Sequence, residues 1–533
     1  MKSYIKVAPL RHLIGTIAAA VVALALWRLF AGLGLNSFWQ DEIFSMRLAE
    51  KADFSAMMSS AVEDTHPPTF YALLWAWTHL FGFDEVSARL LPALCSIGLI
   101  MVILALPRRE TGWLARVVVV VLVVTSPFWI EHADEVRSYA PVSLLLGVAA
   151  LAASRLVPAD ALQGQGGRRF FAILFLISAT VAAASHLFAI YAVAWLCLCL
   201  VIARFECWKI AVTGLGGAVL AGGAYLLQVS LFHNFEDSGR LFAHGPDYLI
   251  GQLKIGLTSG GYPALLAIGA IAVVAVFPGL IRNHAFQRAD MAPIRFDLAL
   301  CFGPFAVTIA GILVTMVVPS LNYRGPQVGL VLGWCGLIGL IDRALKDWPR
   351  VMGGMTLGLV AASAFVILTR QGLQPLPSRH DFRAMAQHLA GMPACDGAII
   401  PVLRNVESEP KPGEIHQAEM RRFLAERFGY YDRRVQHDYR LFPLVGGRYF
   451  GGVAPREVLA ARISGRDQCP VLAIVADVRT YPPEALESAM RSAISANGGD
   501  PARLETRWFL HYGHARANKP VRQLATFTIR PVT

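Results

Sequence analysis

Charged residues are scarce in this chain. Only 16% of its 533 residues are charged, whereas 55% are hydrophobic, and a soluble globular domain carries about 25% charged residues. This composition excludes an ordinary soluble protein. The chain is expected to be a membrane protein, and it is long enough for two domains.

Eleven apolar stretches are predicted to span the membrane as helices. A bilayer core about 30 Å thick requires about 20 apolar residues per helix. Several of the stretches are shorter than this, and the division of the fifth and sixth at Ser185-His186 stays open. The stretches cover residues 13–35, 87–106, 113–131, 139–156, 170–186, 188–204, 210–230, 262–280, 297–318, 327–341 and 351–369.

The distribution of Lys and Arg predicts the orientation of these spans, because basic loops are held on the cytoplasmic side. The N-terminus and every second loop are basic. The loop 36–86 and the long tail 370–533 should therefore lie outside, in the periplasm if the membrane is a bacterial inner membrane. Part of the formal charge of +11 comes from these basic cytoplasmic loops. No element carries the basic stripe with interleaved aromatic residues that is typical of a nucleic-acid-binding surface.

The tail differs in composition from the rest of the chain. Residues 1–369 form the predicted transmembrane domain, and residues 370–533 are predicted to form a soluble α/β domain. The expected helices cover residues 381–391, 415–429 and 482–498, and the expected strands cover residues 396–402, 469–477, 507–513 and 523–530.

Cysteine is also scarce, and no Cys/His spacing matches a zinc site. Of eight cysteines, six lie in predicted spans or at the inner face, where they act as small buried hydrophobes. Cys395 and Cys469 each precede a predicted strand of the tail. If those strands are parallel neighbours, an oxidising compartment favours a disulfide, but the Cα separation that decides it is not visible in a sequence.

The outer loop 36–86 contains acidic residues next to aromatic ones. Asp41 and Glu42 follow the first span, and Asp64 and His66 precede Pro67-Pro68. Charged groups so close to a bilayer are costly unless they serve a polar cavity or the headgroup layer. These four residues are therefore candidates for a functional site.

Pro67-Pro68 predicts the start of a helix, because proline suits the first helical turn. This helix is expected to lie along the outer membrane surface, where tyrosine and tryptophan are favoured, and to hold Asp64 and His66 at headgroup level. Its apolar residues at helical spacing are Phe70, Leu73, Leu74, Trp77 and Phe81, and its interfacial aromatics are Tyr71, Trp75 and Trp77.

Three segments resemble a known family. They are the Asp41-Glu42 pair, the D-x-H-P-P sequence at 64–68 followed by "FGFDEVSARLLPALCSIG", and "EHADEVRSYAPVSLLLG" at 131–147. In their order, their spacing and their predicted side of the membrane, these segments resemble GT-C membrane glycosyltransferases that use polyprenyl-phosphate sugars. Examples are protein O-mannosyltransferases, the lipid A aminoarabinose transferase and rhizobial galacturonosyltransferase-like proteins. The resemblance covers roughly residues 1–200.

The resemblance implies an inverting glycosyltransferase. Such an enzyme would move a sugar from a polyprenyl-phosphate donor to a hydroxyl of an acceptor lipid, glycan or protein at the outer face. The reaction requires a general base, which the resemblance assigns to Asp41. Glu42 and Asp64 would orient the acceptor, or raise the pKa of Asp41 through like-charge proximity.

Cations of the outer face would stabilise the leaving phosphate. Arg137 is preferred, because a guanidinium can donate two hydrogen bonds to phosphate, and His66 and Arg324 are further candidates. Arg324 lies where the family often has an Arg-Tyr pair, but here Tyr323 comes first. Tyr139 would stack or hydrogen-bond beside Arg137, or belong to an aromatic belt. Metal use stays open, since some relatives bind a divalent ion beside the phosphate and others do not.

A transporter or lipid flippase is the alternative from another class. Such proteins often have duplicated halves and ionisable residues at the bilayer midplane. The chain shows no duplication, and its clustered charges lie at the outer edge of the predicted spans. A membrane-anchored binding protein is a third alternative, but eleven spans exceed what an anchor requires.

Overall fold

The structure, a computed structural model, describes most of the membrane-embedded part and portions of the tail. The described residues are 8–64, 66–106, 113–157, 165–232, 246–259, 291–316, 321–347, 349–366, 368–369, 381–392, 395, 399–405, 430–431, 440–446, 469–474, 483–512 and 520–530. The chain divides into two compact units. The helical unit comprises residues 1–33 and 45–369, and the sheet unit comprises residues 34–44 and 370–533.

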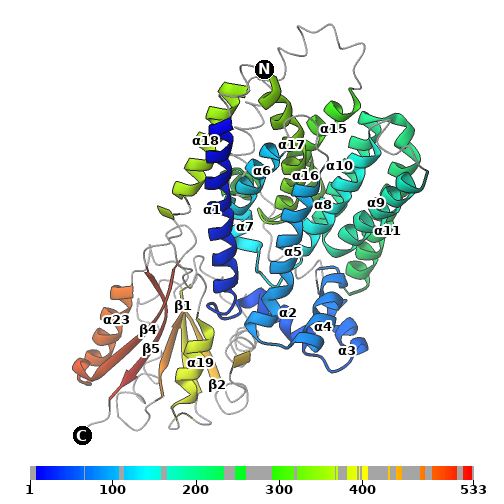
Figure 1. Ribbon diagram of the computed structural model, residues 1–533. Helices are drawn as coiled ribbons and strands as arrows, with labels where there is room; N and C mark the ends of the chain where they lie inside the picture. The colour runs from blue at the N-terminus through cyan, green and yellow to red at the C-terminus, as the bar shows by residue number, and fades with distance from the viewer. Residues whose placement is uncertain are drawn as a thin grey trace. The chain divides into compact units, whose positions relative to one another are not determined.

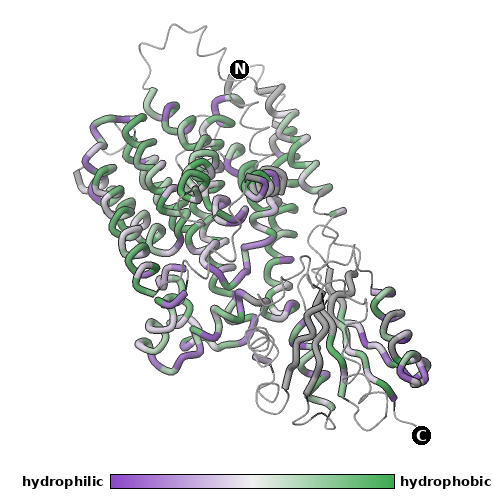
Figure 2. Tube along the Cα trace, turned by 180° about the vertical axis from the view of Figure 1, so that it is seen from behind, coloured by the Kyte–Doolittle hydropathy of each residue, from purple (hydrophilic) through white to green (hydrophobic). Residues whose placement is uncertain are grey.

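The helical unit is an integral membrane bundle. Six of its described helices are long and apolar enough to span a bilayer, or seven if the pair α15 and α16, bent by 49°, forms one span. Figure 1 shows these helices side by side, and Figure 2 shows that their residues are largely hydrophobic. Apart from the short helices between α1 and α5, the described α-helices of this unit, spanning and shorter ones together, are α1 (Ala8–Gly32), α5 (Glu85–Ala105), α6 (Leu114–Thr125), α7 (Pro127–His132), α8 (Tyr139–Leu156), α9 (Gln165–Ser185), α10 (Leu187–Ala203), α11 (Trp208–Phe232), α13 (Pro246–Ser259), α15 (Ala292–Cys301), α16 (Gly303–Thr315), α17 (Leu330–Asp347) and α18 (Pro349–Val366).

The prediction of eleven full spans is not confirmed. The predicted span 113–131 is divided, because Ser126 accepts a hydrogen bond from the N–H of Trp129 and Pro127 starts the new helix α7. The stretch 262–280 lies outside the described residues. Within the described part of the chain, Leu114–Thr125, Leu187–Ala203 and Gly353–Phe365 are apolar but shorter than a spanning helix.

Helix α17 lies at the centre of the bundle. Of the membrane-spanning residues of α17, 94% are buried inside the protein, compared with 28% for α1 and 22% for α11. It packs against α6, α8, α15, α16 and α18. Helices α9 and α10 are separated at His186, whose imidazole accepts a hydrogen bond from the N–H of Phe188 at 3.2 Å. This contact caps α10, so the two helices do divide at Ser185-His186.

Three short helices fill the loop between α1 and α5. They are α2 (Gln40–Ala49), α3 (Phe54–Ala61) and α4 (Thr69–Phe81). The predicted helix after Pro67-Pro68 is confirmed as α4. Its apolar residues at helical spacing differ in burial. The buried residues are Phe70, Tyr71, Leu74 and Thr78, whereas Leu73 and Phe81 are exposed.

The sheet unit contains a five-stranded mixed sheet in the order β2-β1-β3-β5-β4. The pairs β1–β2 and β1–β3 are parallel, and β3–β5 and β4–β5 are antiparallel. Two of its helices are also labelled in Figure 1. The elements are α19 (Phe382–Ala390), β1 (Ile399–Asn405), β2 (Arg440–Gly446), β3 (Val471–Ile474), α23 (Pro483–Ala496), β4 (Leu504–Tyr512) and β5 (Pro520–Ile529).

The predicted elements of the tail that fall on described residues are all present, but β2 was not predicted. It contains Pro443, which cannot donate a hydrogen bond to a sheet ladder. β2 stands at the end of the strand order, where a proline is tolerated. The helix expected at 415–429 lies outside the described residues.

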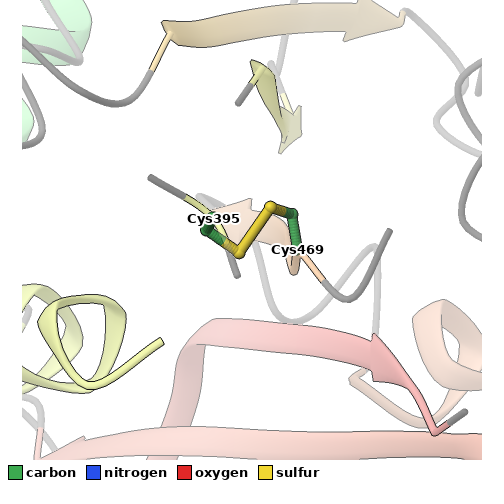
Figure 3. Close-up of a disulfide and its surroundings, with 2 residues drawn as sticks. All are labelled: Cys395 and Cys469. Carbon is green, nitrogen blue, oxygen red and sulfur yellow. A yellow bond between two sulfur atoms is a disulfide. The ribbon is translucent and has the colours of Figure 1, made fainter. Parts of the chain in front are cut away.

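A disulfide joins Cys395 to Cys469 (Figure 3). The two Cα atoms are 5.0 Å apart, within the range that a disulfide requires. The strands that follow these cysteines, β1 and β3, are parallel neighbours. The prediction that the two cysteines are close is therefore confirmed.

Candidate functional site

Asp64, His66 and Arg137 form a hydrogen-bonded chain in the helical unit. An Asp64 carboxylate oxygen lies 3.1 Å from Nδ1 of His66, and Nε2 of the same ring lies 2.9 Å from a guanidinium nitrogen of Arg137. Because arginine can only donate, Nε2 accepts and Nδ1 carries the proton. The imidazole in this arrangement is the Nδ1–H tautomer, and it connects the carboxylate to the guanidinium.

Tyr71 supports the same chain from the first turn of α4. Its hydroxyl donates to Oδ2 of Asp64 at 2.6 Å and lies 3.5 Å from the guanidinium of Arg137. Because α4 begins directly after Pro67-Pro68, this buried side chain lies two residues after the first residue of the helix, Thr69. We refer to Asp64, His66, Tyr71 and Arg137 as the Asp64 cluster.

The backbone of this segment is fixed by helices far away in the sequence. The amide of Gln228, on α11, donates to the carbonyl oxygens of Asp64 at 3.0 Å and His66 at 3.2 Å. The hydroxyl of Thr69 donates to the carbonyl oxygen of Ala184, on α9, at 2.7 Å. Helices α9 and α11 therefore hold the segment that carries Asp64 and His66.

Asp64 is ionised in this setting. Burial acts to raise the pKa of Asp64, but the hydrogen bonds from His66 and Tyr71 and the charge of Arg137 outweigh it, so its pKa lies well below its ordinary value. The His66 side chain is 40% exposed and that of Asp64 only 14%. The cluster thus presents an accessible imidazole above a buried carboxylate.

A second group of charges surrounds Arg324. Its guanidinium lies 3.0 Å from the carboxylate of Glu131 and 4.0 Å from that of Glu135, and its Nε donates to the hydroxyl of Tyr323 at 3.2 Å. Burial acts to lower the pKa of Arg324, but the two carboxylates outweigh it and raise the pKa above its ordinary value. We refer to Glu131, Glu135, Tyr323 and Arg324 as the Arg324 cluster.

Tight packing fixes the backbone next to Arg324. The Asn322 side chain accepts hydrogen bonds from the N–H groups of Arg324 at 3.0 Å and Gly325 at 2.8 Å. A Cβ atom on Gly325 would lie 2.3 Å from the ring of Phe188. Only glycine fits where the backbone of residue 325 approaches the Phe188 ring, so the turn presents Arg324 to Glu131 in one orientation.

Tyr139 belongs to a buried aromatic stack. Its ring lies 4.2 Å from the ring of His132 and 5.3 Å from that of His186, measured between centroids. His132 pairs through Nδ1 with the carboxylate of Glu135. His132 belongs to the segment 131–137, which contributes Glu131 and Glu135 to one cluster and Arg137 to the other.

Asp41 and Glu42 lie in the first turn of α2, on the segment that groups with the sheet unit. Glu42 is 2% exposed, and its carboxylate accepts a hydrogen bond from the N–H of Trp39 at 3.2 Å. An acceptor here satisfies one of the N–H groups left without a partner at a helix start. Glu42 therefore stabilises the start of α2, and Asp41 is half-buried beside it.

Of the seven predicted site residues, the structure joins Asp64, His66 and Arg137 in one cluster. Arg324 forms a separate ion-paired cluster, and Tyr139 packs in the aromatic stack. Sequence reasoning did not identify Gln228, Glu131 or Glu135, and it assigned Tyr71 to the membrane interface. Among the described residues, no three His, Cys, Asp or Glu side chains are grouped so as to hold a metal ion.

The chain matches no protein-family model and no curated protein. It is distantly similar to solved structures. ArnT from Cupriavidus metallidurans, bound to undecaprenyl phosphate, is 14% identical, with 96% of this chain and 97% of that chain covered and a TM-score of 0.47. The oligosaccharyltransferase AglB from Archaeoglobus fulgidus, in complex with an inhibitory peptide and a dolichol-phosphate, is 10% identical, with coverages of 90% and 70% and a TM-score of 0.44. The arabinofuranosyltransferase AftD from Mycobacteria is 15% identical, with coverages of 97% and 41% and a TM-score of 0.43.

Proposed function

We propose that the protein is a membrane glycosyltransferase that uses a polyprenyl-phosphate sugar. The observation that carries this proposal is the Asp64 cluster, in which a buried, ionised carboxylate fixes an accessible imidazole against a guanidinium. A guanidinium is well suited to bind a phosphate through two hydrogen bonds. Asp64 and His66 lie on the connection between α3 and α4, outside the membrane-spanning helices, as a lipid-linked phosphate at the membrane surface requires.

The acidic residues Asp41 and Asp64 have different proposed roles. A carboxylate with a low pKa is a weak proton acceptor, so Asp64 positions His66 and Tyr71 and is not the base. Asp41 is the proposed base. It would take the proton of the acceptor hydroxyl while that oxygen bonds to the anomeric carbon, and the bond from this carbon to the phosphate oxygen breaks with release of the polyprenyl phosphate. A single displacement of this kind inverts the anomeric centre.

Arg137 and His66 are the proposed contacts of the donor phosphate. Arg324 is less suited to this role than its charge suggested, because a phosphate would have to compete with Glu131 at 3.0 Å. We assign Arg324 to holding the segment 131–137 in place, and Tyr139 to packing against His132 of that segment. Metal dependence is not part of the proposal.

The proposed location is the periplasmic side of a bacterial inner membrane. The disulfide between Cys395 and Cys469 supports this side for the tail, because disulfides persist in oxidising compartments and are rare in the cytosol. The acceptor would then be a lipid, glycan or protein of the cell envelope. An impermeant thiol reagent should label a cysteine introduced at residue 450 in intact cells, but not one introduced at residue 345.

Substitution of Asp41 tests the proposed reaction. Asp41→Asn keeps the shape and polarity of the side chain but removes the proton acceptor, so turnover should fall by about 100-fold or more. Donor binding should change little, because cations hold the phosphate. Both quantities are measured on purified protein in nanodiscs containing a polyprenyl-phosphate sugar and a mixture of envelope acceptors.

Two outcomes would contradict the proposal. If Asp41→Asn retains near-native turnover, Asp41 is not the base. If the wild-type protein moves intact donor across a sealed vesicle without cleaving the sugar–phosphate bond, the flippase alternative is correct instead.

A further inference from the structure

The segment that leads into α2 is held by residues near the start of the tail, within the sheet unit. The N–H of Phe382 donates to the hydroxyl of Ser37 at 3.0 Å. The guanidinium of Arg383 donates to the carbonyl oxygens of Gly34 at 3.0 Å and Leu35 at 3.4 Å. These contacts join positions more than 340 residues apart in the sequence, so local structure does not require them.

A second site of contact lies at the other end of the same segment. The N–H of Phe38 donates to the hydroxyl of Tyr431, and the rings of Phe38 and Tyr430 meet edge-on with centroids 5.7 Å apart. Phe38 is 1% exposed. Residues 34–38 are thus fixed at both ends, and Phe38 stands three residues before Asp41.

These contacts are not needed to form α19. Asp381 already caps this helix, because its carboxylate accepts a hydrogen bond from the N–H of Ala384 at 3.0 Å. Arg383 points its guanidinium away from the helix backbone, to the carbonyl groups of residues 34 and 35. What these side chains determine is the path of the segment 34–38, and therefore where α2 begins.

We infer that Arg383 and Tyr431 are positioning residues, which hold the segment 34–38 so that Asp41 is presented at a fixed place at the start of α2. The tail then takes part in catalysis without touching the reacting atoms. The functional half of this inference rests on the proposed role of Asp41. The holding of the segment is a separate property that can be measured without any substrate.

Hydrogen–deuterium exchange on the full-length protein in nanodiscs tests the holding directly. Arg383→Gln and Tyr431→Phe should each raise the exchange rates of backbone amides in residues 35–44 by about tenfold, the equivalent of one lost hydrogen bond to a fixed partner. Turnover should fall while the affinity for donor stays unchanged, because the proposed phosphate contacts belong to the other unit. Arg383→Lys keeps a charged donor and should recover part of both effects.

Arg491→Gln is the matched control in the same unit. Arg491 contacts Glu487 and the carbonyl oxygen of Pro501, so its loss should leave exchange in residues 35–44 and turnover as in the wild type. Unchanged exchange in 35–44 for both Arg383→Gln and Tyr431→Phe would overturn the inference, as would an equal effect of Arg491→Gln. If the wild-type protein transfers no sugar, the proposed function fails, while the exchange result still decides whether the segment is held.

Discussion

The two charged clusters of the helical unit each contain one arginine, but they differ in the number of carboxylates beside it. In the Asp64 cluster, one buried carboxylate supports an imidazole and a guanidinium. In the Arg324 cluster, two carboxylates surround one guanidinium. An arginine between carboxylates mainly fixes structure, whereas an arginine beside an accessible imidazole is suited to an anionic ligand. The neighbours of each arginine therefore decide its role.

Paired substitution of the two arginines should give the largest difference. Arg137→Ala removes a charge-assisted contact to phosphate, which is worth about 1.5–3 kcal/mol, so donor affinity should fall by about 10- to 100-fold and turnover should fall with it. Arg324→Ala should leave donor affinity nearly unchanged. Binding of a fluorescent polyprenyl phosphate to both variants is the measurement. A larger loss of affinity in Arg324→Ala would reverse the roles assigned to the clusters.

Asp64→Asn should weaken the Asp64 cluster in a manner that depends on pH. Because the folded pKa of Asp64 is lowered, its stabilising contribution is fully present above the unfolded pKa of about 3.9 and is lost as the pH falls through the folded value. The wild-type protein should therefore exceed Asp64→Asn by about 1.5–3 kcal/mol in stability between neutral pH and about pH 5. The difference should shrink below about pH 4, as followed by reversible unfolding in detergent. A difference that instead grows with acidification would mean that Asp64 is protonated in the folded protein.

Arg324→Ala should have a smaller effect on stability. It leaves Glu131 and Glu135 without their shared cation, and breaking a fully buried ion pair costs about 3–5 kcal/mol. Since the side chains of Arg324 and Glu131 are 22% and 20% exposed, we expect about 1–2 kcal/mol after allowance for solvent screening. Arg530→Ala is the control and should show almost no loss, because the side chains of Arg530 and its partner Glu505 are 69% and 54% exposed.

The clusters also show which parts of the molecule the sequence could predict. The D-x-H-P-P motif indicated both Asp64 and His66, because a proline pair next to charged residues marks a helix start outside the bilayer. Helix α8 was predicted at its observed bounds, Tyr139–Leu156, because Arg137-Ser138 precede its apolar run and the helix-breaking Pro158 follows it. Local patterns of this kind are visible in one sequence.

Long-range partners could not be predicted in the same way. Helical periodicity shows which residues share a face of α4, but not what that face meets, so Tyr71 was placed at the membrane interface and not beside Asp64. Gln228 is separated from Asp64 by 164 residues, and only the packing of α11 brings them together. Arg324 was predicted to be a phosphate-binding cation of the outer face, but its pairing with Glu131 depends on tertiary structure and is not visible in the sequence.

Tyr71→Phe should have the smallest effect and is the most selective test of the Asp64 cluster. The substitution keeps the buried ring and removes only the hydroxyl, which donates to Asp64 at 2.6 Å. Loss of one such hydrogen bond should cost about 0.5–1 kcal/mol of stability, and donor affinity should fall only severalfold because Arg137 remains. Tyr191→Phe on α10, whose ring packs edge-on against Phe188, is the matched control. If both substitutions behave alike in unfolding and in donor binding, the hydroxyl of Tyr71 does not support Asp64, and the contrast between the clusters rests on the imidazole and the guanidinium alone.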